Sequence, residues 1–392
     1  MRVLSLSTLF PSPVQPTLGR FVANQMRSVA ETGRVDLVML NPVGVPPWPL
    51  SRLNAYAKPA ACPPTSALGP LTVHHPRFPA LPGLADHNPR QIVRALLPLI
   101  RRLHADQPFD LIDAQFFFPD GPAAATIATA LGIPYTIKAR GSDIHYWSTR
   151  PRAHAQLSAA AANAAAILTV SAALGRNMAA LGFPADRIRT HYTGLDRTRF
   201  RVTPRAEARA ALDLSIPANA PLLVTPGSLI AIKGQRLAID ALTHLPTAHL
   251  ALAGTGPDAE ALRAHAAALG VANRVHPLGQ VSHDALPTLM SAADAVVLPS
   301  EREGLANVWI EALACGTPLV IPDIGGAREV VRTAAAGRIA ARDGAAIADA
   351  VREVLEMGGA QDDVAATVAG FSWEENARRL IGIWEEVAGK KG

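Results

Sequence analysis

Two kinds of segment alternate along the chain. Short apolar runs predict buried strands at Val3 to Ser7, Val35 to Leu40, Leu111 to Ala114, Tyr135 to Lys138 and Ile167 to Val170. Between them lie longer stretches with helical periodicity, among them Phe21 to Glu31 and Ala123 to Ala130. Because strands and helices alternate in this way, the pattern predicts a parallel sheet covered by helices on both faces.

The same alternation restarts in the second half of the chain. Strands are predicted at Leu222 to Thr225, His249 to Ala253, Ala295 to Leu298 and Leu319 to Ile321, and helices at Gln235 to Leu242, Glu260 to Leu269 and Trp309 to Ala314. We therefore predict an α/β protein of two Rossmann-like domains that face each other across a cleft. The expected domains are residues 1–197 and 198–372, with the amphipathic end of the chain, 373–392, packing back on the first.

One long segment breaks the alternation. From Pro42 to Pro89 the chain is dense in proline and glycine, which predicts an irregular surface excursion. It contains Trp48 and Tyr56, with Arg52, Lys58 and Arg77 nearby. Such a set would suit contact with an anionic membrane surface, and it would equally suit ordinary solvent-exposed surface.

Composition narrows the class of protein. The 392 residues carry 37 Lys and Arg against 32 Asp and Glu, a net charge of +5 that is too weak and too dispersed to indicate a nucleic-acid partner. The 49% hydrophobic content excludes a disordered chain, and no apolar run approaches the roughly 18 residues of a membrane-spanning helix. The first ten residues resemble a buried strand more than a signal peptide. We expect a cytoplasmic protein.

Cysteine and histidine usage argues against a metal centre. Cys62 and Cys315 are the two cysteines and lie far apart in sequence, so they predict neither a disulfide framework nor a metal cluster. The histidines, such as His74, His75 and His87, lack the spacing of metal ligands. We therefore predict no metal site.

The most informative stretch runs from Leu298 to Val320. A predicted strand ends at Pro299, a polar loop carries Glu303, and a helix that begins near Asn307 or Val308 carries Glu311. Loops at the carboxyl ends of parallel strands bind ligands in open α/β sheets, and a helix N-terminus offers free N–H groups to an anion. Two carboxylates placed in this way suit two hydroxyls of one bound molecule. Alternatively, both are residues favoured at a helix start by the helix dipole.

This stretch closely resembles the E-x7-E motif of glycosyltransferase family 4, whose members are retaining transferases with the GT-B fold. Seven residues separate Glu303 from Glu311. Other segments resemble family features in the same order: Gly19-Arg-Phe, Gly141-Ser-Asp143, Thr193-Gly-Leu-Asp196, Gly227 to Gly234, Leu252 to Pro257, Gly325-Gly326 and Glu329. The resemblance extends over nearly the whole chain and implies a GT-B architecture.

The resemblance also implies roles in binding a nucleotide-sugar donor. Glu311 would hold the ribose hydroxyls and Glu303 the hydroxyls of the transferred sugar, since an ionised carboxylate accepts hydrogen bonds from a diol. Lys233 would pair with the diphosphate as its charge develops. The further donor-binding positions implied are Gly19, Gly227, Ser228, Gly254, Gly256, Gly304, Leu305, Ala306, Asn307 and Val308.

The implied catalytic residues are Glu303, Lys233, Asp143 and Arg140, and the implied acceptor contacts are Gly141, Ser142 and His145. All five first-domain residues follow a predicted strand and should lie at the ligand-binding edge of its sheet. The alternatives are that Asp143 caps the following helix and that His145 is a surface residue.

The sequence departs from the family pattern at two positions. Ser228 stands where many members have an arginine, so either its hydroxyl and a base such as Arg140 or Arg20 substitute, or donor affinity is lower. Arg140 stands where a histidine is frequent, and an arginine cannot act as a base near neutral pH. We therefore expect the leaving phosphate oxygen to take the acceptor's proton.

The implied function is a retaining, metal-independent and cofactor-independent glycosyltransferase. It would move a hexose from a nucleotide-diphosphate sugar to an alcohol acceptor, a lipid-linked or polysaccharide precursor or a small molecule, in cell-envelope polysaccharide synthesis. Its expected location is the cytoplasm, with peripheral association at the inner face of the membrane. The alternatives are a nucleotide-sugar epimerase and a non-catalytic nucleotide-sugar binding protein on the same scaffold.

Overall fold

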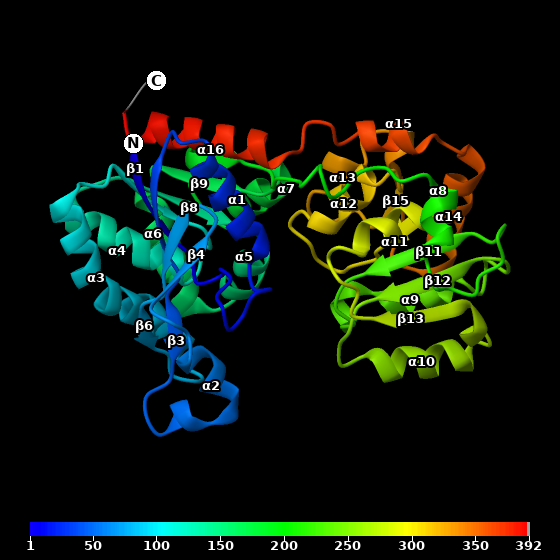
Figure 1. Cartoon of the computed structure of the whole chain (residues 1–392), viewed down its shortest axis with the longest axis horizontal. Coiled ribbons are helices and arrows are strands. Elements are labelled where there is room, and N and C mark those ends of the chain that lie inside the picture. The colour runs from blue at the N-terminus through cyan, green and yellow to red at the C-terminus, as the bar shows by residue number, and fades with distance from the viewer. Residues whose placement is uncertain (390–392) are drawn as a thin grey trace. The chain divides into compact units, whose positions relative to one another are not determined.

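The computed structural model describes residues 1–389, which form two compact units (Figure 1). One comprises Met1–Gly194 together with the chain from Trp373 onwards, and the other is Leu195–Ser372. The chain therefore passes from the first unit to the second after Gly194, three residues before the expected boundary at 197. Of the expected C-terminal segment 373–392, the last three residues lie outside the described part of the chain.

The first unit is built on an eight-stranded sheet. The strand order is β10 (Ile188–Thr190), β9 (Ala166–Thr169), β8 (Tyr135–Ala139), β7 (Leu111–Ala114), β1 (Arg2–Leu6), β2 (Asp36–Leu40), β5 (Leu71–His74) and β4 (Thr65–Leu68). All pairs are parallel except the one at the edge formed by β4 and β5. Strand β1 pairs with both β2 and β7, so the chain winds outward in opposite directions from the point between β1 and β7.

Helices cover this sheet on both faces, as the alternating pattern predicted. They are α1 (Arg20–Glu31), α3 (Asn88–Asp106), α4 (Asp120–Leu131), α5 (Ser142–Trp147), α6 (Pro151–Asn163), α7 (Ala172–Ala180) and α16 (Trp373–Val387). The final helix α16 packs on α1 (Figure 1) and buries Leu380 and Trp384 completely in the same core as Val22 and Met26. The apolar stripe of α16 is thus covered by the first unit.

The expected irregular excursion at 42–89 is wrong in its detail, because most of the segment is regular. It contains β3 (Val43–Val45), η1 (Leu50–Arg52), α2 (Asn54–Ala60), β4, β5, β6 (Arg77–Pro79) and η2 (Ala85–His87). Strands β5 and β4 extend the main sheet, and β3 and β6 form a parallel ladder of their own. Most of the prolines stand between these short elements or at their ends, where a missing N–H costs little, although Pro59 lies inside α2.

The second unit has six parallel strands in the order β13 (Val275–Gly279), β12 (His249–Ala253), β11 (Leu222–Pro226), β14 (Ala295–Val297), β15 (Leu319–Ile321) and β16 (Gly337–Ile339). The winding direction reverses between β11 and β14, which is the switch point of a doubly wound sheet. Its α-helices are α8 (Arg205–Ala210), α9 (Gln235–Ala241), α10 (Ala259–Ala268), α11 (Leu286–Ala292), α12 (Asn307–Ala314), α13 (Ala327–Val330), α14 (Gly344–Met357) and α15 (Gln361–Ala366). This unit also contains the short 3-10 helices η4 (Ala231–Lys233), η5 (Ala272–Arg274) and η6 (Ala334–Ala336). A further short 3-10 helix, η3 (Ala185–Arg187), belongs to the first unit.

Each unit is therefore an α/β domain of the Rossmann type, as predicted. Within the described residues, no helix is both long enough and apolar enough to cross a bilayer.

Candidate functional site

The candidate site lies at the switch point of the second sheet, where two predicted residues meet. Lys233 ends η4 after β11, and Glu303 lies in the loop after β14. Lys233 Nζ donates to Glu303 Oε1 at 2.6 Å, and both side chains are half-buried. The carboxyl ends of β11 and β14 thus bring a cation and a carboxylate together at the edge where doubly wound sheets bind ligands.

Backbone hydrogen bonds fix the loops that carry this pair. The N–H of Glu301 donates to the carbonyl of Ile232 at 2.7 Å, which ties the loop after β14 to η4. The N–H of Gly326 donates to the carbonyl of Gly304 at 2.8 Å, which ties the same loop to the segment after β15. Three strand-end loops therefore form one backbone-bonded platform.

A second pair of loops extends the platform on the other side of β11. The N–H of Gly227 donates to the carbonyl of Ala253 at 2.9 Å, and the N–H of Leu229 donates to that of Thr255 at 3.0 Å. Ser228 lies exposed between them, and its carbonyl accepts from Gln235 Nε2 at 2.9 Å. The bonds occupy the N–H groups of Gly227 and Leu229 and leave Ser228 at the surface between them.

Glu311 lies on α12, whose first residue, Asn307, is where the sequence predicted the helix to begin. The first N–H groups of a helix have no partner within it, and the N-cap Ala306 supplies no side-chain oxygen. Burial raises the pKa of Glu311 to about 7, while the charge of Arg199 lowers it. At neutral pH this carboxyl is therefore poised between its two protonation states, so a partner that donates hydrogen bonds would favour the ionised one.

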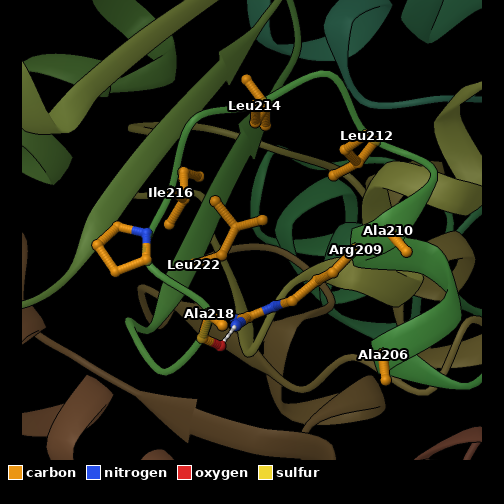
Figure 2. A pocket seen from close by; sticks show the side chains of 9 residues that line it. Ala206, Arg209, Ala210, Leu212, Leu214, Ile216, Ala218 and Leu222 are labelled. Atoms are coloured by element: carbon orange, nitrogen blue, oxygen red, sulfur yellow. Dashed lines mark hydrogen bonds between the residues drawn. The ribbon is translucent and has the colours of Figure 1, made fainter.

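The opposite edge of the second sheet holds a pocket of different character. A cavity of about 350 Å³ lies beside Leu222, at the amino end of β11. Its lining is mainly aliphatic side chains of α8 and the segment 212–218, which Figure 2 shows. Its charged member, Arg209, donates to the carbonyl of Ala218 at 3.1 Å and pairs with Asp294 at 2.5 Å. Because this arginine is already paired and the rest of the lining is apolar, the platform at the carboxyl edge is the candidate site.

In the first unit, Arg140 is the centre of a buried polar network at the carboxyl end of β8. Its Nε donates to the carbonyl of Gln115 at 2.8 Å, and its Nη2 donates to Gln115 Oε1 at 2.5 Å and Gln25 Oε1 at 3.2 Å. The guanidinium also lies over the ring of Phe21, 4.8 Å from its centroid. Burial lowers the pKa of Arg140 to about 10, so it remains a cation at neutral pH.

Asp143 holds the loop that follows β8. It is fully buried and accepts backbone N–H groups from Phe117 at 2.9 Å, Arg140 at 3.0 Å, Gly141 at 2.9 Å and Ile144 at 3.0 Å. Burial nevertheless raises its pKa above the usual carboxyl value. Asp143 is the second residue of α5, whose N-cap is Gly141 with no side-chain cap hydrogen bond, so the helix-capping alternative is wrong. Its carboxylate instead holds the backbone of the loop before the helix and of Phe117.

With these sites defined, comparison with known proteins identifies the family. Residues 54–199 match the family described as Glycosyltransferase Family 4, and residues 210–369 match the family described as Glycosyl transferases group 1. The two matches cover most of both units. Both models describe glycosyltransferases, and the chain is a glycosyltransferase whose first unit matches family 4.

Relatives and solved structures agree with this assignment. The glycosyltransferase is 28% identical over 394 residues to a protein named as a teichuronic acid biosynthesis glycosyltransferase, TuaC, of Bacillus subtilis, covering 97% of each chain. Its fold is similar to that of sucrose-phosphate synthase from Thermosynechococcus elongatus, with a TM-score of 0.80 at 18% identity over 100% of both chains. It is also similar to Anabaena HepE in complex with UDP-glucose, with a TM-score of 0.66 at 21% identity over 99% and 98% of the two chains. The fold is GT-B.

The remaining predicted residues of this glycosyltransferase take the following places. Gly19 caps α1 with φ of 61°, and an added Cβ would collide with the carbonyl of Leu9, so the glycine is required by its own backbone. Gly141 is buried next to Asp143, while Ser142 is exposed and His145 is half-buried on α5. Of the predicted first-unit residues, Ser142 is therefore the most accessible to a ligand.

Sequence reasoning missed Asp120, Gln25 and Gln115, which surround Arg140. Asp120 is the first residue of α4, is fully buried, and accepts the N–H of Thr8 at 2.9 Å. Burial raises its pKa to about 7. Its importance comes from burial, which the sequence around Pro119 does not signal. Phe117 and Phe118 in the preceding loop are fully buried and are packing residues.

In residues 1–389, no three His, Cys, Asp or Glu side chains come together as metal ligands.

Replacing Gly254 by alanine is expected to displace the loop after β11. An added Cβ at Gly254 would overlap the carbonyl oxygen of Gly227, and backbone on both sides leaves no flexible group to yield. We expect a loss of roughly 1–3 kcal/mol in the free energy of unfolding, measured by urea denaturation. Gly370→Ala is the matched control, since its Cβ would meet open space. Equal stability of the two variants would show that the loops are not packed as described.

Proposed function

We propose that this glycosyltransferase transfers a hexose from a nucleotide-diphosphate sugar to an alcohol, with retention of anomeric configuration. The observation that carries the proposal is the Lys233–Glu303 pair at the switch point, 2.6 Å apart, with Glu311 on the adjoining helix α12. A cation for the diphosphate, a carboxylate for the sugar and a carboxylate for the ribose are thereby offered by one platform.

Glu311 is proposed to accept both ribose hydroxyls of the donor nucleotide. A carboxylate has acceptor capacity for two such donors, and the bonds would favour its ionised form. Because burial raises the pKa of free Glu311 to about 7, donor binding would draw the carboxyl into ionisation and release a proton near neutral pH. Donor affinity is therefore expected to increase between pH 6 and pH 8.

Lys233 is proposed to gain a second partner when the donor binds. In the structure its ammonium is hydrogen-bonded to Glu303. An ammonium has three N–H donors, so Lys233 can contact a phosphate oxygen while keeping Glu303 in position for the sugar hydroxyls. As the bond between the sugar and the diphosphate breaks, Lys233 and the first N–H groups of α12 would stabilise the growing charge on the diphosphate without a metal ion.

The proton balance follows from Arg140, which stands where a histidine is frequent in the family. An arginine remains protonated near neutral pH and cannot accept the acceptor's proton. The bond from the anomeric carbon to the diphosphate oxygen breaks, and the bond to the acceptor oxygen forms on the same face of the sugar. The acceptor's proton passes to the leaving diphosphate oxygen, so no protein base is required.

The first unit is proposed to bind the acceptor through Gly141, Ser142 and His145. Asp143 and Arg140 would act as positioning residues, because their polar atoms hold the loop and its neighbours. The acceptor class proposed is a lipid-linked or polysaccharide precursor in cell-envelope synthesis on the cytoplasmic side, which the name of the Bacillus relative supports. Ser228 and the platform's N–H groups would contact the diphosphate in place of the frequent arginine.

A thermal-shift panel of UDP-, GDP- and ADP-sugars tests the proposal. A ligand present at 100 times its Kd adds about 2.7 kcal/mol to the stability of the protein it binds, so one nucleotide class should raise the Tm by several degrees. The Glu311→Ala variant should show no such shift. Absence of a shift with every nucleotide sugar would contradict the proposal. Product analysis with and without an alcohol acceptor then separates transfer from epimerisation and from binding without turnover.

A further inference from the structure

Exposed apolar side chains are concentrated in one segment of the first unit. Trp48 is 74% exposed, and Leu53 is 53% exposed. Leu50, Leu81 and Leu84 are also exposed, so five large apolar side chains face solvent within residues 48–84. Single exposed apolar residues are ordinary on a soluble protein, but a group of this kind marks an interaction surface.

The topology brings these five residues to one end of the β3/β6 ladder. The two strands are parallel, with Val45 opposite Pro79, and the N–H of Ala80 donates to the carbonyl of Val45 at 3.1 Å. The chain therefore leaves both strands in the same direction, toward Trp48, Leu50 and Leu53 on one side and Leu81 and Leu84 on the other. In Figure 1 the blue segment with η1 and α2 extends beyond the main sheet of this unit.

Positive charge is concentrated in the same part of the chain. Residues 37–105 contain seven Lys and Arg against one Asp, a net charge of +6, so the rest of the chain together carries about −1 of the total +5. Within the described residues, none of these seven cations forms an ion pair with a carboxylate; they are Arg52, Lys58, Arg77, Arg90, Arg94, Arg101 and Arg102. The charge is thus available to a partner.

A groove next to this surface is lined by two of the cations. Arg90 and Arg94 of α3 face an open groove of about 540 Å³ between α3, α4 and α6, which Thr126 and Thr129 also line. The groove begins beside η2, since Gln156, another lining residue, donates to the carbonyl of Asp86 at 3.0 Å. The basic groove, which is large enough for a lipid headgroup, therefore begins next to the part of the chain that carries the exposed apolar side chains.

We propose that this surface docks the protein on a membrane rich in anionic lipids. We define the docking surface as Trp48, Leu50, Leu53, Leu81, Leu84 and the groove arginines Arg90 and Arg94. Indole and leucine side chains enter the boundary between headgroups and acyl chains, while arginines are attracted to the negative surface potential. Charge complementarity selects the partner, because the segment 37–105 that carries this surface has a net charge of +6 and would repel a second copy of itself. The half-buried Tyr56, expected from the sequence to contribute, is not among the anchors.

Vesicle co-sedimentation of the full chain tests this proposal. We expect binding to vesicles of phosphatidylcholine with about one-third phosphatidylglycerol at low salt, and weak binding to pure phosphatidylcholine. Because the attraction is screened, binding should fall as salt rises from about 0.05 to 0.5 M. Absence of binding to the anionic vesicles at low salt would overturn the proposal, whether or not the protein binds nucleotide sugars.

Matched variants distinguish this surface from the rest of the unit. Replacing Arg90 and Arg94 by glutamine should weaken the partition coefficient by about tenfold or more, since each arginine near the surface contributes about 1 kcal/mol. Arg176→Gln, an exposed arginine on α7, should leave it unchanged. Leu53→Ser should weaken binding, whereas Leu181→Ser, with 45% exposure at the end of α7, should not.

Two further outcomes would overturn the proposal. An equal loss in the α7 controls would show that binding is unspecific. A salt-insensitive dimer in sedimentation velocity that Leu53→Ser dissociates, without vesicle binding, would assign the surface to a second copy of the chain.

Discussion

The Glu311→Gln variant is expected to be more stable than the natural protein at pH 8 and to lose nucleotide-sugar binding. Burial raises the folded-state pKa of Glu311 from 4.5 to about 7, so the folded protein binds more protons than the unfolded chain between these values. Stability therefore falls as pH rises through this window, by up to about 3 kcal/mol. Glutamine carries no charge and removes that loss.

Urea denaturation of both proteins at pH 5 and pH 8 measures the effect. The free energy of unfolding of the variant should exceed that of the natural protein by about 1–3 kcal/mol at pH 8 and by little at pH 5. In calorimetry at pH 8, donor affinity should fall by roughly two orders of magnitude, since a hydrogen-bonded carboxylate is lost. Greater stability with unchanged affinity would show that Glu311 is a buried carboxyl without a ligand role. Unchanged stability at pH 8 would contradict the raised pKa.

The Lys233→Met variant is expected to lose kcat by two to three orders of magnitude while its fold remains intact. The ammonium opposes the charge that appears on the leaving diphosphate, and removing one such group typically costs 10²–10³ in rate. The Lys233–Glu303 pair is half-buried, so its loss should cost little stability, about 1 kcal/mol or less. Steady-state kinetics with the donor identified by thermal shift, together with the Tm, measure both quantities.

Arg302→Met is the control for Lys233→Met. Arg302 is an exposed cation of the same loop whose contact is the neighbouring Glu301 at 3.5 Å. Its replacement should change kcat less than threefold. If both variants lose activity to the same degree, the effect is one of general positive charge near the site, and the specific role of Lys233 is wrong.

Regular alternation made most of the fold predictable from the sequence. The amphipathic segment expected at 373–392 forms the helix Trp373–Val387, and α12 begins at Asn307 as expected. These elements carry their own signals: an amphipathic stripe in the first and a polar loop followed by an apolar run in the second. The nine predicted strands likewise lie within one residue of their expected bounds, whereas β4, β5, β10, β13 and β16 were not predicted.

The segment 42–89 could not be predicted in the same way. Strands β4 and β5 have four residues each, and their place in the sheet depends on the pairing of Met39 and Leu40 of β2 with Val73 and His74. Such pairing is a long-range contact with no local signature, whereas the dense prolines gave a strong local signal for irregular chain.

The candidate site was predictable in part, for a related physical reason. Lys233 and Glu303 were expected from the resemblance to family 4, and the switch point brings them together. The network around Arg140 was not foreseen beyond Arg140 and Asp143, because Gln25 and Asp120 derive their importance from burial beside it. Burial of a polar side chain is a property of the packed unit.

A crystal structure of the full chain with the best-binding nucleotide-diphosphate sugar tests the central claim most directly. The diphosphate should lie within hydrogen-bond distance of Lys233 Nζ and the backbone N–H groups after β11, and both ribose hydroxyls should donate to the carboxylate of Glu311. A nucleotide bound elsewhere, or one whose ribose contacts a different carboxylate, would contradict the claim that this platform is the donor site.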